Sequence, residues 1–137
     1  MGGPELTVGA VVVDDDRLLL VRRAQSPAAG AWAVPGGRVE AGETLAEAVT
    51  RELREETGLD GVCGPLIGWV ELVPETADDR HVVILDFEVT LMASDEPTAG
   101  GDATAARWIP LGDVAEQVLA PGLAEFLHDH AIIATIT

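Results

Sequence analysis

The acidic residues of one short segment are spaced so that together they could hold a metal ion. Glu52, Glu55 and Glu56 stand three and four positions apart, which is the spacing of neighbours on one face of an α-helix. Carboxylates this close repel one another unless a cation compensates them, and all-oxygen sites suit hard divalent ions such as Mg²⁺ or Mn²⁺. We interpret the three glutamates as metal ligands. A solvated acidic helix face is the alternative, because charge runs are common on helices.

A helix over residues 44–57 would position these glutamates. Thr44 and Glu47 form the S/T-x-x-E capping box that opens a helix, and Gly58 stands where a C-terminal cap belongs. Apolar residues recur inside it at four-residue intervals: Leu45, Val49 and Leu53. The pattern therefore predicts an amphipathic helix with the acids away from its apolar stripe.

A glycine-rich segment leads into that helix. Gly36 and Gly37 close a Val-Pro-Gly-Gly run, and we predict a turn there, because glycine lets the backbone come close to a metal or a phosphate. Glu43 lies in the loop that follows, and Arg51 directly precedes Glu52. A glycine turn alone is weak evidence for a metal or phosphate site, whereas the turn, the glutamates and the arginine in a fixed register are strong evidence for one.

Residues 37–59 resemble the Nudix box, G-x5-E-x7-R-E-U-x-E-E-x-G-U with U an aliphatic residue, at every defined position. At average residue usage, a chance match has a probability on the order of 10⁻⁹ per starting position. Three other segments look like Nudix hydrolase landmarks: residues 18–23, 32–37 and 107–111. The resemblance implies an enzyme that hydrolyses a nucleoside diphosphate linked to another moiety, X.

The remaining sequence predicts an α/β fold in a single domain over residues 1–137. Apolar, β-branched runs predict the strands, at residues 5–13, 17–23, 62–73, 81–92 and 105–109, and two later helices follow at 111–119 and 123–130. Loops are expected at 25–31 and 74–79. The resemblance implies the Nudix fold, an α/β/α sandwich with a mixed β-sheet.

The charge balance limits the partners of the chain. It has 24 acidic and 8 basic residues and contains no lysine, so it should repel nucleic-acid polymers and anionic membranes. A salt-adapted or GC-rich source would explain the acids outside the box equally well. Cys63 is the single cysteine, so no internal disulfide can form. Without a long apolar run or a signal-like start, we expect a cytoplasmic, soluble protein.

The resemblance also implies roles for individual residues in a Mg²⁺ or Mn²⁺ site. The Gly37 carbonyl would be a ligand beside the three helix glutamates, and Asp102, in a Gly-Gly-Asp-Ala loop, would be a further acidic ligand or base. A plain turn aspartate is the alternative for Asp102. Glu55 is our first choice of general base, with Glu43 or an acid outside the box as alternatives. Arg51 should orient Glu43 or Glu55, with a direct phosphate contact as the alternative.

Four residues are candidate substrate contacts: Arg23, Arg38, Trp32 and Trp69. Arg23 ends a predicted strand close to the box and could meet a phosphate, or form a surface ion pair instead. Each tryptophan could stack on a base, although core packing is the alternative in a chain with so few aromatic residues.

The identity of X rests on a single proline. Pro74 lies fifteen residues beyond the end of the box, a position that in Nudix hydrolases is associated with ADP-ribose pyrophosphatases. The resemblance therefore favours ADP-ribose as the substrate, with AMP and ribose 5-phosphate as products. A nucleoside triphosphate pyrophosphohydrolase of the sanitising type, acting also on oxidised dGTP, is the alternative, and a nucleotide-sensing module without turnover is a third reading. A homodimer is compatible with the resemblance.

Overall fold

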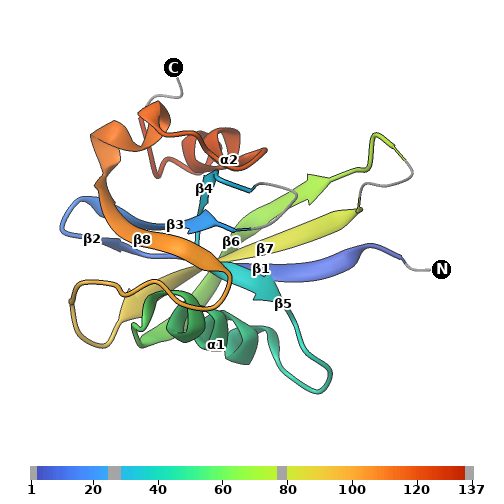
Figure 1. Ribbon diagram of the computed structural model, residues 1–137, viewed down its shortest axis with the longest axis horizontal. Coiled ribbons are helices and arrows are strands. Elements are labelled where there is room, and N and C mark those ends of the chain that lie inside the picture. Colours follow the sequence, from blue (N-terminus) through green and yellow to red (C-terminus); the bar gives the residue numbers. More distant parts are fainter. Residues whose placement is uncertain (1–2, 25–28, 77–79, 135–137) are drawn as a thin grey trace.

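The computed structural model describes residues 3–24, 29–76 and 80–134. In these residues the strands form a central body, with one helix on each side of it (Figure 1). The strands are β1 (Glu5–Val11), β2 (Val13–Asp14), β3 (Arg17–Arg23), β4 (Trp32–Ala33), β5 (Gly36–Arg38), β6 (Gly61–Leu72), β7 (Val82–Leu91) and β8 (Ala103–Pro110). The helical segments are α1 (Leu45–Thr57), the 3₁₀ helix η1 (Leu111–Glu116) and α2 (Leu123–Asp129).

The strands form two sheets. The first has the order β5-β1-β7-β6 and is mixed, because β1 pairs with β7 in parallel while β5 and β6 pair antiparallel with their neighbours. In the second sheet, β3 pairs antiparallel with β2, β4 and β8. The predicted α/β fold with a mixed sheet is confirmed, and the second, antiparallel sheet adds to it.

Two apolar clusters stabilise this arrangement. Buried residues of α1 pack against the strands in one cluster, which includes Ala48, Val49 and Leu53 together with Val8 and Leu19. The other cluster joins both sheets to α2, through residues that include Val11, Leu18, Trp32, Phe126 and Leu127. Alternate residues of β1 enter different clusters, because successive side chains of a strand point to opposite faces.

The structure corrects the predicted turn at Gly36 and Gly37. These glycines begin β5 and pair antiparallel with β1, in the register Gly9 to Gly36 and Val8 to Gly37. Neither glycine has a positive φ, unlike Gly42 at 82°. The glycines let β5 come close to β1 and do not form a turn. A Cβ on Gly36 would collide with the carbonyl of Val8 in β1.

The helix predicted over residues 111–119 is shorter than expected. It is a 3₁₀ helix that ends at Glu116, because the next residues bind the backbone of β4. The Trp32 N–H donates to the Val118 carbonyl at 2.8 Å, and the Ala120 N–H donates to the Trp32 carbonyl at 2.8 Å. Val13, placed in the first predicted strand, belongs to β2. The predicted loops at 25–31 and 74–79 lie partly outside the described residues.

No helix in the described part of the chain has both the length and the apolar character needed to cross a membrane.

Candidate active site

The N- and C-terminal caps of α1 fix the register of the acidic residues. The Thr44 hydroxyl accepts from the Glu47 N–H at 3.1 Å, and the Glu47 carboxylate accepts from the Thr44 N–H at 2.9 Å. Gly58 ends the helix in the left-handed conformation, with φ of 73°. The capped helix predicted over 44–57 is confirmed, and its buried stripe turns Glu52 and Glu56 toward β5.

The two glycines of β5 meet these two glutamates. A Cβ on Gly37 would lie 2.5 Å from the Glu52 carboxyl carbon, so any other residue here would displace that carboxylate. The Gly36 N–H donates to Glu56 Oε1 at 2.9 Å. The strand and the helix therefore bring a backbone segment and two carboxylates into direct contact.

Burial raises the pKa of the Glu52 and Glu56 carboxyl groups. Glu56 is 6% exposed, and burial raises its pKa to about 7, although the hydrogen bond from Gly36 opposes the shift. Burial also raises the pKa of Glu52, against the effect of Arg51. The charge of Asp102 acts on both groups in the same direction as burial. Three acids from two parts of the chain thus interact at one place.

Arg51 holds several of the carboxylates. Its guanidinium donates to Glu43 at 2.6 and 2.9 Å, to Glu52 at 2.7 Å and to Glu55 at 3.3 Å. It also donates to the Arg38 carbonyl at 2.9 Å. One arginine thus fixes the loop, the helix and β5 relative to one another, through the bidentate geometry in which guanidinium groups bind carboxylates.

Glu43 is the main partner of this arginine. The hydrogen bonds from Arg51 lower the pKa of Glu43 to about 2, with help from the backbone N–H of Glu40. A carboxylate with so low a pKa is a poor proton acceptor near neutral pH. Glu43 is therefore better suited to hold Arg51 than to act as the general base.

The acids differ in arrangement from the expected cluster of three glutamate ligands. Among the described residues, no three His, Cys, Asp or Glu side chains are grouped as they would be around a metal ion. Arg51 draws Glu55 outward, where its side chain is 52% exposed, whereas Glu56 is turned toward Gly36. The donor chemistry still fits a hard divalent ion, because two largely buried carboxylates stand beside the Gly37 backbone with Asp102 nearby.

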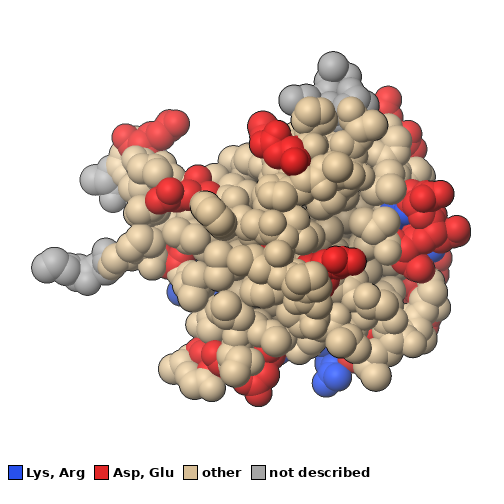
Figure 2. Space-filling view, turned by 180° about the vertical axis from the view of Figure 1, so that it is seen from behind, with Lys and Arg blue, Asp and Glu red and all other residues tan. Residues whose placement is uncertain are grey.

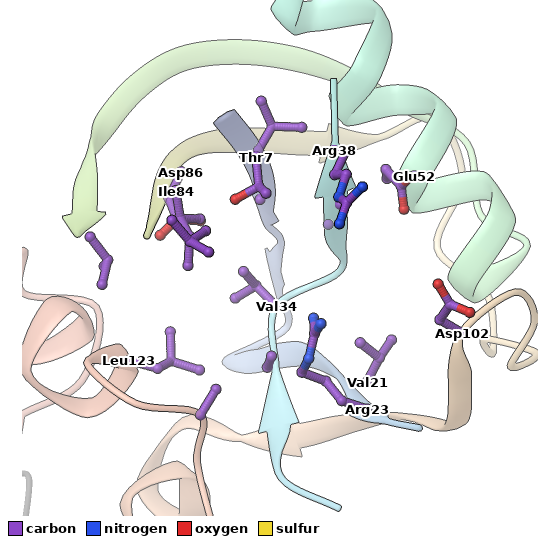
Figure 3. A pocket seen from close by; sticks show the side chains of 18 of the residues that line it. Thr7, Val21, Arg23, Val34, Arg38, Glu52, Ile84, Asp86, Asp102 and Leu123 are labelled. Atoms are coloured by element: carbon purple, nitrogen blue, oxygen red, sulfur yellow. The ribbon is translucent and has the colours of Figure 1, made fainter. Parts of the chain in front are cut away.

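A cavity of about 550 Å³ opens beside these acids, within the size range of small-molecule sites. Figure 3 shows Glu52, Asp102 and Arg23 on one side of it, and Asp86 with Ile84 on the other. We call these sides the acid end and the Asp86 end. Arg23 points into the cavity, and its buried Nε has no hydrogen-bond partner among the described residues.

The four candidate substrate contacts divide into two pairs. Arg23 and Arg38 both line the cavity, and Arg38 forms an ion pair of 3.0 Å with Glu5 at its rim. Trp32 is 7% exposed and packs in the core. The guanidinium carbon of the exposed Arg107 lies 5.5 Å from its ring centre. Trp69 is 66% exposed, and it must point to the opposite face of β6 from Val70, which lines the cavity. The structure thus places the arginines, but neither tryptophan, at the cavity.

Sequence reasoning missed Asp86 as a cavity residue. It is 2% exposed on β7, within a run of β-branched and aliphatic residues. An acid at the centre of an apolar strand was the available signal. Its place at the cavity depends on the pairing of β7 with β1 and β6, which the sequence does not reveal.

The surface agrees with the strongly acidic composition. Figure 2 shows many more acidic than basic side chains on the face away from the view of Figure 1. The cavity shares this acidic excess, although Arg23, Arg38 and Arg80 are also among the residues that line it. Its acidic lining residues are Glu5, Glu40, Glu52, Glu56, Asp86 and Asp102.

Comparison with known protein families identifies the family of the chain. The family model for the NUDIX domain matches residues 3–130. The chain belongs to the NUDIX domain family. It is 37% identical over 111 residues to the ADP-ribose pyrophosphatase of Methanocaldococcus jannaschii, covering 81% of this chain and 64% of that protein. It is also 43% identical over 61 residues to the CTP pyrophosphohydrolase of Escherichia coli, covering 44% of this chain and 45% of that protein.

Solved Nudix structures share the fold. The MutT protein of Methanosarcina mazei has a TM-score of 0.82 and 25% identity, covering 96% of each chain. The NUDIX domain of Shewanella oneidensis NrtR, in complex with ADP ribose, has a TM-score of 0.79 and 26% identity, over 96% of this chain and 88% of that one. A bifunctional NMN adenylyltransferase/ADP ribose pyrophosphatase of Francisella tularensis, with AMP and a manganese ion, has a TM-score of 0.68 and 26% identity, over 96% and 41%.

Proposed function

We propose that this Nudix protein hydrolyses the pyrophosphate bond of a nucleoside diphosphate linked to X, with ADP-ribose as the leading substrate. The observation that carries the proposal is the joining of two features in one cavity. Buried, mutually interacting carboxylates of the Nudix box form one end of it, and the Arg23 side chain points into its interior. In the reaction a water oxygen bonds to phosphorus as the P–O bond of the bridging oxygen breaks, and ADP-ribose gives AMP and ribose 5-phosphate.

Glu52, Glu56, the Gly37 carbonyl and Asp102 are the residues that would hold divalent ions, with Mg²⁺ or Mn²⁺ as the favoured metals. When bound, such an ion supplies a water of lowered pKa and neutralises charge on the phosphates. The pKa values of Glu52 and Glu56 are raised by burial, so the carboxylates would bind as anions only when a cation compensates them. Related Nudix proteins support a metal, because the Francisella neighbour holds manganese.

Arg51 and Arg23 have separate tasks in this proposal. Arg51 is saturated by contacts to Glu43, Glu52 and Glu55, so it positions carboxylates rather than binding phosphate. Arg23 lines the cavity and points into it, and its charge acts on Glu56. A guanidinium group in this place can donate to a phosphate oxygen, which makes Arg23 the proposed phosphate contact.

Glu55 remains our proposed general base. Glu43 and Glu52 bind Arg51 at 2.6 and 2.7 Å, and Glu56 accepts from Gly36. The contact of Glu55 to Arg51 is longer, at 3.3 Å, and its side chain is half exposed. It is therefore the box glutamate least committed to a structural partner, which leaves it able to take a proton from water.

ADP-ribose is favoured by two observations. Pro74 stands at the position associated with that substrate, and the relative from Methanocaldococcus is named for it. A nucleoside triphosphate is the second candidate, because the Escherichia coli relative is named as a CTP pyrophosphohydrolase.

The test is a substrate panel with product analysis in Mg²⁺ and then Mn²⁺. It contains ADP-ribose, NADH, diadenosine polyphosphates, and normal and oxidised nucleoside triphosphates, with the Glu56→Gln variant as blank. We expect the highest kcat/KM for ADP-ribose and no turnover in metal chelator. Preference for a triphosphate would move the assignment to the second candidate. Tight nucleotide binding without turnover in either metal would contradict hydrolysis and favour a sensing module.

A further inference from the structure

The loop between β7 and β8, residues 92–102, is joined to the C-terminal end of α1. We call it the Asp102 loop. The last carbonyl groups of a helix have no partner within the helix, and here the loop supplies donors to two of them. The Thr98 N–H donates to the Thr57 carbonyl at 2.8 Å, and the Gly100 N–H donates to the Glu56 carbonyl at 3.2 Å. The loop therefore completes the end of the helix that bears the box glutamates.

Gly100 lies directly against the backbone of this helix. A Cβ at Gly100 would lie 2.5 Å from the Glu55 carbonyl oxygen, an atom that cannot turn aside as the end of a flexible side chain can. Gly101 serves a different purpose, because its φ is 56° and the Ala103 N–H donates to the Gly100 carbonyl at 3.0 Å across it. Gly100 thus sets the distance between loop and helix, whereas Gly101 allows the turn that leads through Asp102.

Asp102 is also fixed to the end of β3. Its carbonyl accepts from the N–H of Ala24 at 3.0 Å, and Ala24 directly follows Arg23, the last residue of β3. Asp102 and Arg23 both line the cavity at its acid end (Figure 3). The charges of both side chains act on Glu56. The Asp102 loop therefore connects the box helix to the proposed phosphate contact through backbone hydrogen bonds.

The beginning of the Asp102 loop has anchors of its own. The Trp108 indole N–H donates to the Asp95 carbonyl at 2.9 Å, and the Ser94 hydroxyl donates to the Asp14 carboxylate at 2.6 Å. The loop is thus held before Gly100 as well as after it. A change at Gly100 should therefore shift the middle of the loop and leave the fold intact.

We propose that Gly100 is a positioning residue for the Nudix reaction, whose close contact with α1 sets the place of Asp102 at the acid end. This inference rests on the proposed function, in which Asp102 helps to hold a divalent ion. A side chain at position 100 would push the loop from the helix by on the order of 1 Å before it reached an ordinary contact distance. Misplacement of a site by this much can cost about a hundredfold in rate.

Amide hydrogen exchange in the metal-free protein tests the contact itself. The amides of Thr98 and Gly100 should exchange at least about tenfold more slowly than that of Ala99 between them, which has no hydrogen-bond partner among the described residues. Mg²⁺ should slow both further, because an ion that binds the docked arrangement also stabilises it. The Leu111 amide, bonded to the Asp16 carbonyl at 3.0 Å, should not respond. Exchange as fast as that of Ala99, or no effect of Mg²⁺, would overturn the proposal.

One substitution at Gly100 and a matched control measure the effect on the metal site. Gly100→Ala should raise the dissociation constant of Mn²⁺, measured by calorimetry without substrate, by about tenfold, and lower kcat by about 10- to 100-fold. Gly112→Ala is the control, because a Cβ on Gly112 meets nothing within 4 Å, and it should keep the wild-type values. A purely structural Gly100 would lower the Tm of its variant and leave Mn²⁺ binding at the wild-type value.

A double-mutant cycle shows whether Gly100 acts through Asp102. Asp102→Asn alone should weaken Mn²⁺ binding by about tenfold. In the Gly100→Ala background it should weaken binding by less than about twofold, because the displaced carboxylate no longer contributes. Equal effects of Asp102→Asn in both backgrounds, or no effect in the wild type, would overturn the proposal.

The outcomes distinguish failure of the inference from failure of the proposed function. Turnover by the wild type, with Mn²⁺ binding unchanged in Gly100→Ala, would sink the inference and leave hydrolysis standing. Mn²⁺ binding that depends jointly on Gly100 and Asp102, in a protein that turns over no substrate of the panel, would support the positioning role and contradict hydrolysis.

Discussion

The buried carboxylates at the two ends of the cavity differ in their hydrogen-bond partners. At the acid end, Glu52 and Glu56 each have a donor within the fold, from Arg51 and from the Gly36 N–H. At the Asp86 end, one carboxyl lies among glycines and aliphatic side chains, with a buried oxygen that has no described partner. The first arrangement orients two carboxyl groups beside one another, which suits a metal ion that compensates their charge. The second encloses one carboxyl group, and burial raises the pKa of Asp86 to about 7.

The largest effect should come from removing a carboxylate at the acid end. Glu56→Gln keeps an oxygen for the Gly36 N–H but loses the negative charge, so we expect kcat to fall by about a thousandfold. The measurement is product release at saturating substrate in Mg²⁺, with the exposed α2 residue Glu125, changed to Gln, as control. Circular dichroism and Tm should show a folded variant. Activity within about tenfold of wild type would remove Glu56 from the metal site.

The pH dependence of stability should reveal both buried acids. The folded-state pKa values of Glu56 and Asp86 are each raised to about 7 by burial, from model values of 4.5 and 3.8. Their favourable contribution is therefore complete below pH 4, and it is lost as the pH rises toward 7. In chelator, the free energy of unfolding should fall across this window by on the order of a few kcal/mol for each group.

Single variants separate the contributions of Glu56 and Asp86 to the pH dependence of stability. Asp86→Asn and Glu56→Gln should each flatten the curve of unfolding free energy against pH, measured by urea titration between pH 4 and 8. Mg²⁺ should raise the stability of wild type and Asp86→Asn at pH 8, because it binds the folded acid end. Equal stabilisation of Glu56→Gln by Mg²⁺ would show that the metal binds elsewhere.

A smaller effect is expected from Arg51→Lys. Lysine keeps the charge but cannot reproduce the two contacts to Glu43 together with those to Glu52 and Glu55. We expect a loss of about 10- to 100-fold, the range seen when residues that orient metal ligands are changed. The loss should fall on kcat and on the metal concentration for half-maximal rate. A rise in substrate KM alone would instead indicate that Arg51 binds phosphate.

The smallest effect should come from Trp69→Ala. The ring is 66% exposed and points away from the cavity, so we expect less than about 0.5 kcal/mol in stability. Measured kcat/KM should stay within twofold of wild type, an order-of-magnitude expectation for a residue without contact to the site. A large rise in KM would restore Trp69 as a stacking residue.

The acid end could be predicted from sequence because its information is local. The capping box, the apolar stripe and Gly58 fix α1, and the helix period then places the glutamates on one face. Even here, the sequence could not tell which acid is buried. That depends on β5, which approaches the helix through Gly36 and Gly37 and takes Glu56 as a partner.

The Asp86 end was beyond sequence reasoning because its information is not local. Gly9, Asp86 and Gly68 are far apart in the chain and meet only through the registers of three strands. Strand pairing at such separation depends on tertiary packing rather than on local pattern. The same limit explains why Trp32, a candidate for stacking, instead packs in the core beside α2.

The measurement that tests the acid end most directly compares Glu56→Gln with the control Glu125→Gln on ADP-ribose, or on the preferred substrate of the panel. We expect Glu56→Gln to lower kcat by about a thousandfold in saturating Mg²⁺ and to lose the stabilisation by Mg²⁺ at pH 8, while Glu125→Gln keeps both. Wild-type kcat together with undiminished stabilisation by Mg²⁺ in Glu56→Gln would contradict a metal site at the acid end.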